Sequence, residues 1–468
     1  MNTIGTPTIG TPPGGLPRPS EPAEDGALPP TETLRFATAG SVDDGKSTLV
    51  GRLLHDSKSV LADQLAAVEA ASRQRGGQAP DLALLTDGLR AEREQGITID
   101  VAYRYFATPR RRFILADTPG HVQYTRNMVT GASTADLALV LVDARHGIVE
   151  QTRRHLAVAA LLCTPQVTLV VNKMDLVGRS EQVFAAIAAE FAHCAHSLGV
   201  AGVTAIPVSA LEGDNVVRPS DTMGWYAGPT VLEHLETVPS GIDPRTQAAR
   251  LPVQYVIRPH SAAHRDYRGY AGQLTSGVLR VGDRVTVLPA GLNSTITTID
   301  TPAGPAEEAR SPQSVTVQLA DDIDIARGDL LAPEATAPRL TRQLVATVCH
   351  LTEQPLRAGQ RVLLRHTSRT VRAVVESIDS RLDLRDLAEK PGATALQVND
   401  IGRITVRTAE PLALDGYTDL RRTGAFLLID PDDGDTLTAG MADAPEPDRA
   451  EGVRSSPHGE HENFTVAR

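Results

Sequence analysis

The amino-acid sequence predicts an α/β domain followed by two all-β barrel domains. Two observations support this division. From Leu34 to about Arg245, short apolar runs alternate with helical stretches, which is the pattern of a parallel sheet with helical crossovers. From about Leu251 the helical stretches nearly disappear, and short Val, Leu, Ile and Thr runs with Gly and Asp turns take over, as in β barrels.

The two ends of the chain differ in composition from the part between them. Residues 1–32 are rich in Pro and Gly and contain a direct repeat, Thr3–Pro7 followed by Thr8–Pro12. Such a segment cannot bury a core, so we expect a disordered tail. Residues 442–468 are polar, and we expect them to be disordered as well.

The first folded region is expected to span residues 33–247. It contains runs that are typical of buried strands and longer stretches that are typical of helices. The strands are Phe113–Ala116, Leu137–Val142 and Val167–Val171, and the helices are Glu150–Leu162 and Glu181–Leu198. Because strands alternate with helices, we expect one parallel sheet with helical crossovers.

The second half of the chain has the texture of all-β structure, as the run Gly277–Leu288 illustrates. A Pro-rich patch, Ala332–Arg339, divides this half into residues 248–338 and 339–441. Each part has the size of an ordinary domain. We therefore expect two β-barrel domains here.

Composition and charge exclude several classes of protein. A formal net charge of -11 over 468 residues argues against a simple nucleic-acid binder. No apolar run approaches the roughly 18 residues of a membrane span, and the start lacks the pattern of a signal peptide. The three cysteines form no C-x-x-C pair, and their odd number suits a reducing compartment. We expect a cytoplasmic protein with neither a membrane nor a nucleic-acid partner.

A phosphate-binding loop is predicted at Gly40–Ser47, which fits G-x-x-x-x-G-K-[ST]. An apolar strand candidate precedes it and the helical stretch Thr48–Leu54 follows, and this context argues against a chance match. Loop amides would wrap the phosphates, Lys46 would reach the β- and γ-phosphates, and the Ser47 hydroxyl would bind Mg²⁺. The expected nucleotide-binding residues of the loop are Gly40, Ser41, Val42, Asp43, Asp44, Gly45, Lys46 and Ser47.

A second motif follows the strand that ends at Ala116. Asp117 would hold the Mg²⁺ shell through water, and the Gly120 amide would sense a γ-phosphate. Asp and Gly are common in turns, so this pattern is informative mainly because it follows a phosphate loop. The residues concerned are Asp117, Thr118, Pro119, Gly120 and His121.

Two residues are candidates for the hydrolytic step besides Lys46. His121 can orient the attacking water, although a surface histidine on a loop is the alternative. Thr98, in Arg93–Asp100, can close over Mg²⁺ and the γ-phosphate, although an ordinary strand entry is the alternative. We expect Lys46, Thr98 and His121 to be catalytic, and Ser47, Thr98 and Asp117 to bind the metal.

The base is predicted to be guanine. Asp175 can accept hydrogen bonds from both N1–H and the exocyclic amine of guanine, a donor pair that adenine lacks. The alternative, a loop with a helix-capping Asp, is less consistent with the order of the motifs. The expected base-site residues are Asn172, Lys173, Met174 and Asp175, with Ser209, Ala210 and Leu211 giving backbone contacts. Together these motifs predict an α/β P-loop GTPase domain with GTP and Mg²⁺ as ligands.

The motifs resemble the translation-factor class of GTPases, in which a histidine follows the glycine of the second motif. Within that class, the chain is most similar to the large GTPase subunit of bacterial ATP sulfurylase, sulfate adenylyltransferase subunit 1. Elongation factors typically have His at the position of Asp44. The similar stretches are Asp87–Tyr105, Asp117–His121, Gln123–Asp136, Met223–Thr230 and Gly424–Asp430, and the likeness covers about residues 34–441.

The resemblance implies a heteromer. A separate small catalytic subunit would form adenylyl sulfate and pyrophosphate from ATP and sulfate, and this chain would hydrolyse GTP to drive that transfer. Val122 stands where the family commonly has Glu. Some members carry a fused adenylylsulfate kinase, which is not expected here because no other lysine lies in a phosphate-loop pattern.

Two alternatives to this function stay open at the level of sequence. One is a translation GTPase of the elongation or release type, against which Asp44 and the acidic balance argue. The other is a nucleotide-binding scaffold that no longer hydrolyses GTP. The intact residues Lys46, Ser47, Thr98, Asp117 and His121 argue against the scaffold.

Overall fold

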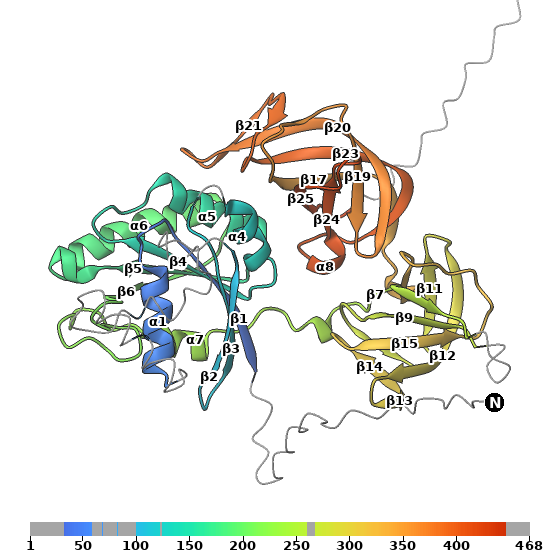
Figure 1. The fold of residues 1–468 in the computed structure, drawn as a ribbon, viewed down its shortest axis with the longest axis horizontal. Helices are drawn as coiled ribbons and strands as arrows, with labels where there is room; N and C mark the ends of the chain where they lie inside the picture. Colours follow the sequence, from blue (N-terminus) through green and yellow to red (C-terminus); the bar gives the residue numbers. More distant parts are fainter. Residues whose placement is uncertain are drawn as a thin grey trace, which may run out of the picture.

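The computed structural model describes residues 32–58, 68, 82, 100–121, 124–259 and 267–445. Most of both expected tails, Thr98, and the pair Val122 and Gln123 lie outside the described residues. The remaining chain forms an α/β region followed by two β regions, so the predicted fold class is confirmed (Figure 1). The domain boundaries at 33–247, 248–338 and 339–441 stay predictions.

A six-stranded sheet organises the first region. Its order is β2-β3-β1-β4-β5-β6, and all neighbours are parallel except β2 and β3. The strands are β1 Thr33–Ala39, β2 Ala102–Ala107, β3 Arg112–Asp117, β4 Leu137–Asp143, β5 Gln166–Asn172 and β6 Val203–Pro207. The central strand β4 is buried at every position, as expected for a continuous apolar run between two helical layers.

Helices cover both faces of this sheet (Figure 1). They are α1 Lys46–Asp56, α4 Thr125–Ala132, α5 Glu150–Leu161, α6 Glu181–Ser197 and α7 Val231–Thr237. Met128, Leu156 and Phe191 bring α4, α5 and α6 into one apolar core. Leu49 and Leu235 bring α1 and α7 into the core on the opposite face. The helices predicted at Glu150–Leu162 and Glu181–Leu198 agree with α5 and α6 to within one residue.

The second region is a curled antiparallel sheet of order β7-β16-β11-β12-β15-β9-β8, with β13 beside β12. The strands are β7 Leu251–Pro252, β8 Tyr255–Ile257, β9 Gly269–Gln273, β11 Arg284–Leu288, β12 Leu292–Thr301, β13 Gly304–Ala306, β15 Ser314–Leu319 and β16 Leu330–Pro333. A two-stranded pair, β10 Val278–Arg280 with β14 Glu308–Arg310, lies beside it. The Gln254 amide donates to the Ala271 carbonyl at 2.8 Å, so the sheet curls back on itself.

The third region is a closed barrel. Its order is β19-β24-β25-β17-β23-β20, and β20 pairs again with β19. The strands are β17 Arg339–His350, β19 Arg361–His366, β20 Arg369–Asp383, β23 Ile401–Leu414, β24 Ala425–Ile429 and β25 Thr436–Ala442. The shorter strands are β18 Leu356–Arg357, β21 Ala388–Pro391 and β22 Ala395–Leu396, and α8 is Arg421–Gly424.

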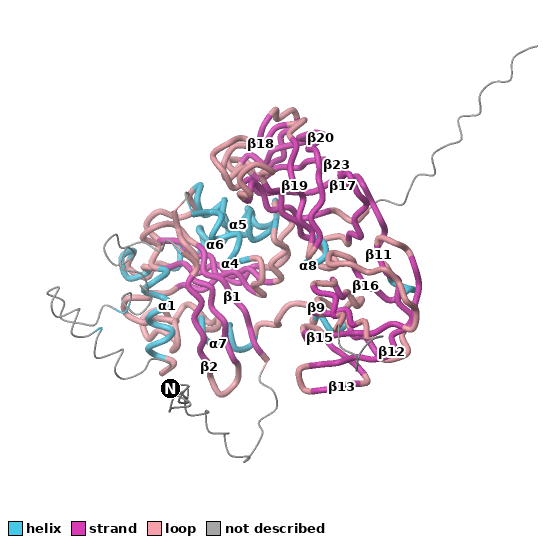
Figure 2. The backbone as a smooth tube through the Cα atoms, turned by 45° about the vertical axis from the view of Figure 1, so that its right-hand side comes forward, coloured by secondary structure: helices cyan, strands magenta, loops and turns pink. Residues whose placement is uncertain are grey.

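The barrel contacts both other regions. In Figure 2, α8 lies between the first region, on its α4 side, and the second β region. Arg421 of α8 donates to the carbonyls of Ser133 and Ala135 at 2.9 and 3.2 Å. Arg250, just before β7, forms a buried ion pair with Asp415 at 2.9 Å. Among the described residues, no helix is long and apolar enough to cross a membrane.

Candidate functional site

The phosphate loop connects β1 to α1 at the carboxyl edge of the sheet. Three of its residues have a positive φ: Gly40 with 154°, Asp43 with 69° and Gly45 with 89°. Gly45 is required for a second reason, because a Cβ there would lie 2.4 Å from Nδ2 of Asn172. The loop therefore wraps closely around the start of α1, where backbone amides and the helix dipole favour a phosphate.

Lys46 is buried at the first position of α1. Its Nζ donates to the carbonyls of Gly40 at 2.7 Å and Ser41 at 2.9 Å. Burial lowers the pKa of Lys46, and the nearby Asp117 carboxylate opposes that shift. The ammonium thus lies inside the curve of the loop, where a nucleotide phosphate would approach.

Asp44, the residue that differs from elongation factors, points beneath the loop. Its Oδ2 accepts a hydrogen bond from the Ser41 amide at 2.5 Å, and only 7% of the residue is exposed. Burial raises the pKa of the Asp44 carboxyl, and the charge of Lys46 opposes that rise. Asp44 therefore stabilises the conformation of the loop through its hydrogen bond with the Ser41 amide.

The second motif lies against the first. The Thr38 hydroxyl donates to Oδ1 of Asp117 at 2.7 Å, and the Thr118 hydroxyl donates to the Thr38 carbonyl at 2.5 Å. These bonds hold the end of β3 to the end of β1. At Gly120 a Cβ would lie 2.3 Å from Nζ of Lys46, so only glycine allows this close approach.

The two other candidates for hydrolysis differ in what the structure describes. His121 is exposed at the end of the second motif, with its ring centroid 6.0 Å from that of Tyr124. The Tyr124 amide donates to the His121 carbonyl at 2.9 Å, at the entry to α4. Thr98 lies outside the described residues.

Asn172 joins three of the predicted motifs. Its Nδ2 donates to the Asp44 carbonyl at 2.7 Å, and its Oδ1 accepts from the Ala210 amide at 3.0 Å. Lys173 reaches the same loop, because its Nζ donates to the Asp43 carbonyl. The phosphate loop, the turn after β5 and the turn after β6 are thereby held together.

The remaining base-site candidates surround this junction. Met174 is fully buried, Asp175 is half-buried in the 3₁₀ turn Met174–Val177, and 70% of Leu211 is exposed. Ser209 is buried, and its hydroxyl accepts from the Glu212 amide at 3.3 Å. The candidates thus place the half-buried carboxylate of Asp175 beside the exposed edge of the site at Leu211.

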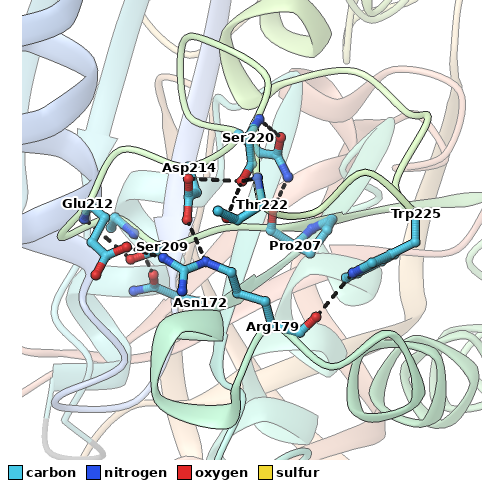
Figure 3. Close-up of polar contacts among 11 residues, drawn as sticks. Asn172, Arg179, Pro207, Ser209, Glu212, Asp214, Ser220, Thr222 and Trp225 are labelled. Atoms are coloured by element: carbon cyan, nitrogen blue, oxygen red, sulfur yellow. Dashed lines mark hydrogen bonds and ion pairs between the residues drawn. The ribbon is translucent and has the colours of Figure 1, made fainter.

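Sequence reasoning missed several residues that shape this edge. Arg179 pairs with Asp214 at 3.1 Å and with Glu212, and its carbonyl accepts from the Trp225 indole (Figure 3). Arg52 of α1 donates to the carbonyls of Ala210 and Leu211 at 3.2 and 2.5 Å. No short motif contains these arginines, so no sequence signal was available for them.

Asp143 was also missed, although its place at the end of an all-buried strand was a usable signal. It contacts Nζ of Lys173 at 3.0 Å and the Arg145 guanidinium at 2.6 Å. Burial alone would raise the pKa of Asp143, but hydrogen bonds from Arg145 and Lys173 outweigh it and hold the pKa well below its usual range. The Asp143 carboxylate thus holds the ammonium of Lys173 beside the loop.

The side chains near Gly120 fit a magnesium ion by their chemistry. Ser47 and Asp117 supply hard oxygen donors, and Mg²⁺ is usually held by one or two protein oxygens together with phosphates and water. No group of three or more His, Cys, Asp or Glu side chains gathers in the part of the chain that the structure describes.

The sequence of this chain matches known protein families. Residues 31–251 match the Elongation factor Tu GTP binding domain, and residues 343–443 match the GTP-eEF1A C-terminal domain-like family. Sulfate adenylyltransferase subunit 1 of Aeromonas salmonicida is 50% identical over 410 residues, which cover 87% of this chain and 86% of that protein. The chain belongs to the sulfate adenylyltransferase subunit 1 family.

Further relatives support this membership. The subunit 1 protein of Vibrio vulnificus strain YJ016 is 51% identical over 411 residues, or 87% of this chain and 85% of that protein. The "Bifunctional enzyme CysN/CysC" of Mycobacterium tuberculosis H37Rv is 58% identical over 412 residues, or 88% of this chain and 67% of that protein. Membership confirms the GTPase-subunit function that the resemblance implied and does not favour the translation-factor alternative.

A solved structure of Sup35 with GDP covers 88% of this chain and 94% of its own at 21% identity. The TM-score of this match is 0.40.

Proposed function

We propose that this chain hydrolyses GTP at the junction of its phosphate loop with the turns after β3, β5 and β6, and that hydrolysis drives adenylyl transfer on a separate small catalytic subunit. There, sulfate would attack the α-phosphorus of ATP, forming adenylyl sulfate and releasing pyrophosphate. The observation that carries the GTP site is the pair of bonds made by Asn172, which tie the phosphate loop to both base-site turns.

The residues would divide the work as follows. Amides of the phosphate loop and Lys46 hold the phosphates, and Asp175 accepts from the guanine edge. Ser47 and Asp117, with Thr98, would hold Mg²⁺, which when bound neutralises charge on the β- and γ-phosphates. His121 would orient the water that attacks the γ-phosphorus, so GDP and phosphate are the products. Three free cysteines support a cytoplasmic location, and the acidic net charge supports the absence of a nucleic-acid partner. The heteromer is supported by the name of the relatives, subunit 1.

The coupling is tested by purifying the chain together with a candidate small subunit. Adenylyl sulfate synthesis from ATP and sulfate is measured with GTP, with a non-hydrolysable GTP analogue, and without nucleotide. We expect synthesis to rise only with GTP. Synthesis at the full rate without GTP would refute the coupling.

The hydrolytic site is tested with His121→Ala in the same complex. We expect GTP affinity to be kept, and single-turnover GTP cleavage to fall by about 10²–10³, the usual effect of losing one positioned transition-state group. Adenylyl sulfate synthesis should fall in parallel. His193→Ala, on the exposed face of α6, is the matched control. Cleavage at the normal rate in His121→Ala would remove His121 from the mechanism.

A further inference from the structure

A buried histidine lies on α5, behind the loop that carries His121. Only 2% of His155 is exposed, and none of the sequence motifs includes it. Its Nε2 lies 2.9 Å from Nε2 of Gln151, one turn earlier on the same face of the helix. The same Gln151 nitrogen lies 3.3 Å from the Gly120 carbonyl oxygen. A short chain of polar contacts thus leads from the helix interior to the second motif.

The donors and acceptors of this chain can be assigned. The Gly120 carbonyl can only accept, so Gln151 must present its NH₂ group to it. That NH₂ group also faces the His155 ring, so Nε2 of His155 must accept, and the ring proton lies on Nδ1. This requires a neutral ring. Burial lowers the pKa of His155 to about 3, and the charges of Lys46 and Arg154 act in the same direction.

Burying His155 at this position lowers the stability of the fold, which indicates a functional role for its side chain. Nδ1 of His155 is buried and has no hydrogen-bond partner among the described residues. A buried, unsatisfied N–H destabilises a fold, whereas an apolar side chain of similar size would not. His155 supplies the hydrogen-bond acceptor that fixes the orientation of the Gln151 amide. Ala157 and Val158, its neighbours on α5, are apolar and buried, as the core position would favour.

The contact at Gly120 has a direct geometric consequence for His121. The Gly120 carbonyl and the His121 amide belong to one planar peptide unit. A hydrogen bond to that carbonyl therefore sets the direction in which the chain leaves Gly120 toward His121. The same glycine packs against Nζ of Lys46, so the unit is held from two sides.

We propose that Gln151 and His155 are positioning residues for GTP hydrolysis: His155 orients the Gln151 amide, and Gln151 holds the Gly120–His121 peptide in the direction that aims His121. This rests on the proposed role of His121. The contacts of Gln151 are to the Gly120 carbonyl and to His155, and neither residue belongs to the predicted nucleotide-binding motifs. We therefore expect the pair to act on the rate of hydrolysis and not on the affinity for GTP.

Three variants test the relay. Gln151→Glu keeps the shape of the side chain but replaces the donor with an acceptor. His155→Leu removes the acceptor that orients Gln151. We expect each to lower single-turnover GTP cleavage about tenfold or more, with GTP and GDP affinities within about twofold of the parent. The double variant should be no slower than Gln151→Glu alone, because His155 acts through Gln151.

The control is Arg153→Gln, which changes a neighbouring residue of α5 that pairs with Glu190 on the surface. It should leave cleavage unchanged. His155→Gln, which restores an oxygen acceptor, should recover part of the rate lost in His155→Leu.

Several results would overturn the relay. One is normal cleavage in Gln151→Glu. Another is additive loss in the double variant, and a third is a fall in nucleotide affinity equal to the fall in rate, which would mark the pair as merely structural. If His121→Ala is slow while Gln151→Glu is normal, only the relay fails. If His121→Ala also cleaves normally, the proposed role of His121 fails first.

Discussion

Asp175 lies half-buried in the turn after β5, three residues from the Asn172 that ties this turn to the phosphate loop. Its carboxylate can accept from both guanine donors, whereas an amide offers one acceptor and one donor group. Xanthine has an oxygen in place of the guanine amine, so it matches the amide. We expect Asp175→Asn to weaken GTP about tenfold or more and to favour xanthosine triphosphate, measured by competition against fluorescent GDP.

The matched control for this change is Asp221→Asn, in an exposed loop of the same region. It should keep the parent's preference for GTP. An unaltered preference in Asp175→Asn as well would remove Asp175 as the residue that reads the base.

Gly120 brings the second motif close to the phosphate loop. A Cβ there would lie 2.3 Å from Nζ of Lys46 and 2.6 Å from the Gly40 carbonyl oxygen, which is backbone and cannot swing aside. Gly120→Ala must therefore displace the second motif. Because the Gly120 amide is expected to sense the γ-phosphate, GTP affinity should fall about tenfold, while GDP affinity changes little.

Titration calorimetry with a non-hydrolysable GTP analogue and with GDP measures this difference. Gly224→Ala is the control, since an added Cβ there meets nothing within 4 Å. Equal affinities of Gly120→Ala and the parent for the GTP analogue would show that the second motif is not a γ-phosphate sensor.

At the scale of elements, the short helix α7 packs in the same core as α1, the helix that follows the phosphate loop. Thr230 and Glu233 form a reciprocal capping box at its start, with bonds of 3.2 and 2.9 Å. The helix buries Val231 and Leu235 in the core that also holds α1. We expect Thr230→Ala to lower the unfolding free energy of this region by about 1 kcal/mol.

The single tryptophan makes this measurable in a chain of several domains. Trp225 packs on Phe184 of α6, so its fluorescence reports unfolding of the first region in urea. Thr237→Ala, at the exposed end of α7, is the control and should be nearly neutral. A midpoint for Thr230→Ala that equals that of the control would show that the capping box does not stabilise this region.

The elements that sequence reasoning predicted well are those whose contacts are local. The phosphate loop needs glycines and a following helix within eight positions, and β4 is recognisable from its unbroken apolar run. Gln151 was missed because it bonds to Gly120, 31 positions earlier, and neither residue type signals the other. Arg52 and Asp143 were missed for the same reason. Arg52 bonds to the turn after β6, and Asp143 contacts Lys173 in the turn after β5. Such pairings depend on the order of strands in the sheet, which no local pattern specifies.

Across the whole molecule, α5 lies between the GTP site and the barrel. Gln151 near its start contacts the second motif, and the Leu162 carbonyl after its end accepts from the Tyr417 hydroxyl of the third region at 3.2 Å. Ala157 and Leu161 line a cavity of about 420 Å³ between α5 and the barrel. The helix therefore contacts the second motif at one end and the barrel at the other.

Arg421 makes two further hydrogen bonds across this junction. Its guanidinium donates to two backbone carbonyls, of Ser133 and Ala135, and lies 6.0 Å from the centre of the Tyr417 ring. Hydrogen bonds from a charged donor stabilise by about 1.5–3 kcal/mol. Arg421→Ala should therefore increase the population in which the barrel is detached by about tenfold to a hundredfold. Hydrogen exchange of the Ser133–Asp136 segment and of β25 should accelerate by a similar factor.

Arg365→Ala, on the exposed side of β19, is the control and should leave exchange at both places unchanged. Since the junction also contains the apolar residues Ile401 and Met441, the variant should stay folded, and its GTP affinity should be kept. Unchanged exchange in Arg421→Ala would mean that the apolar contacts alone hold the barrel on the GTP-binding region. Faster exchange with normal GTP affinity would instead assign Arg421 to the docking of the two regions.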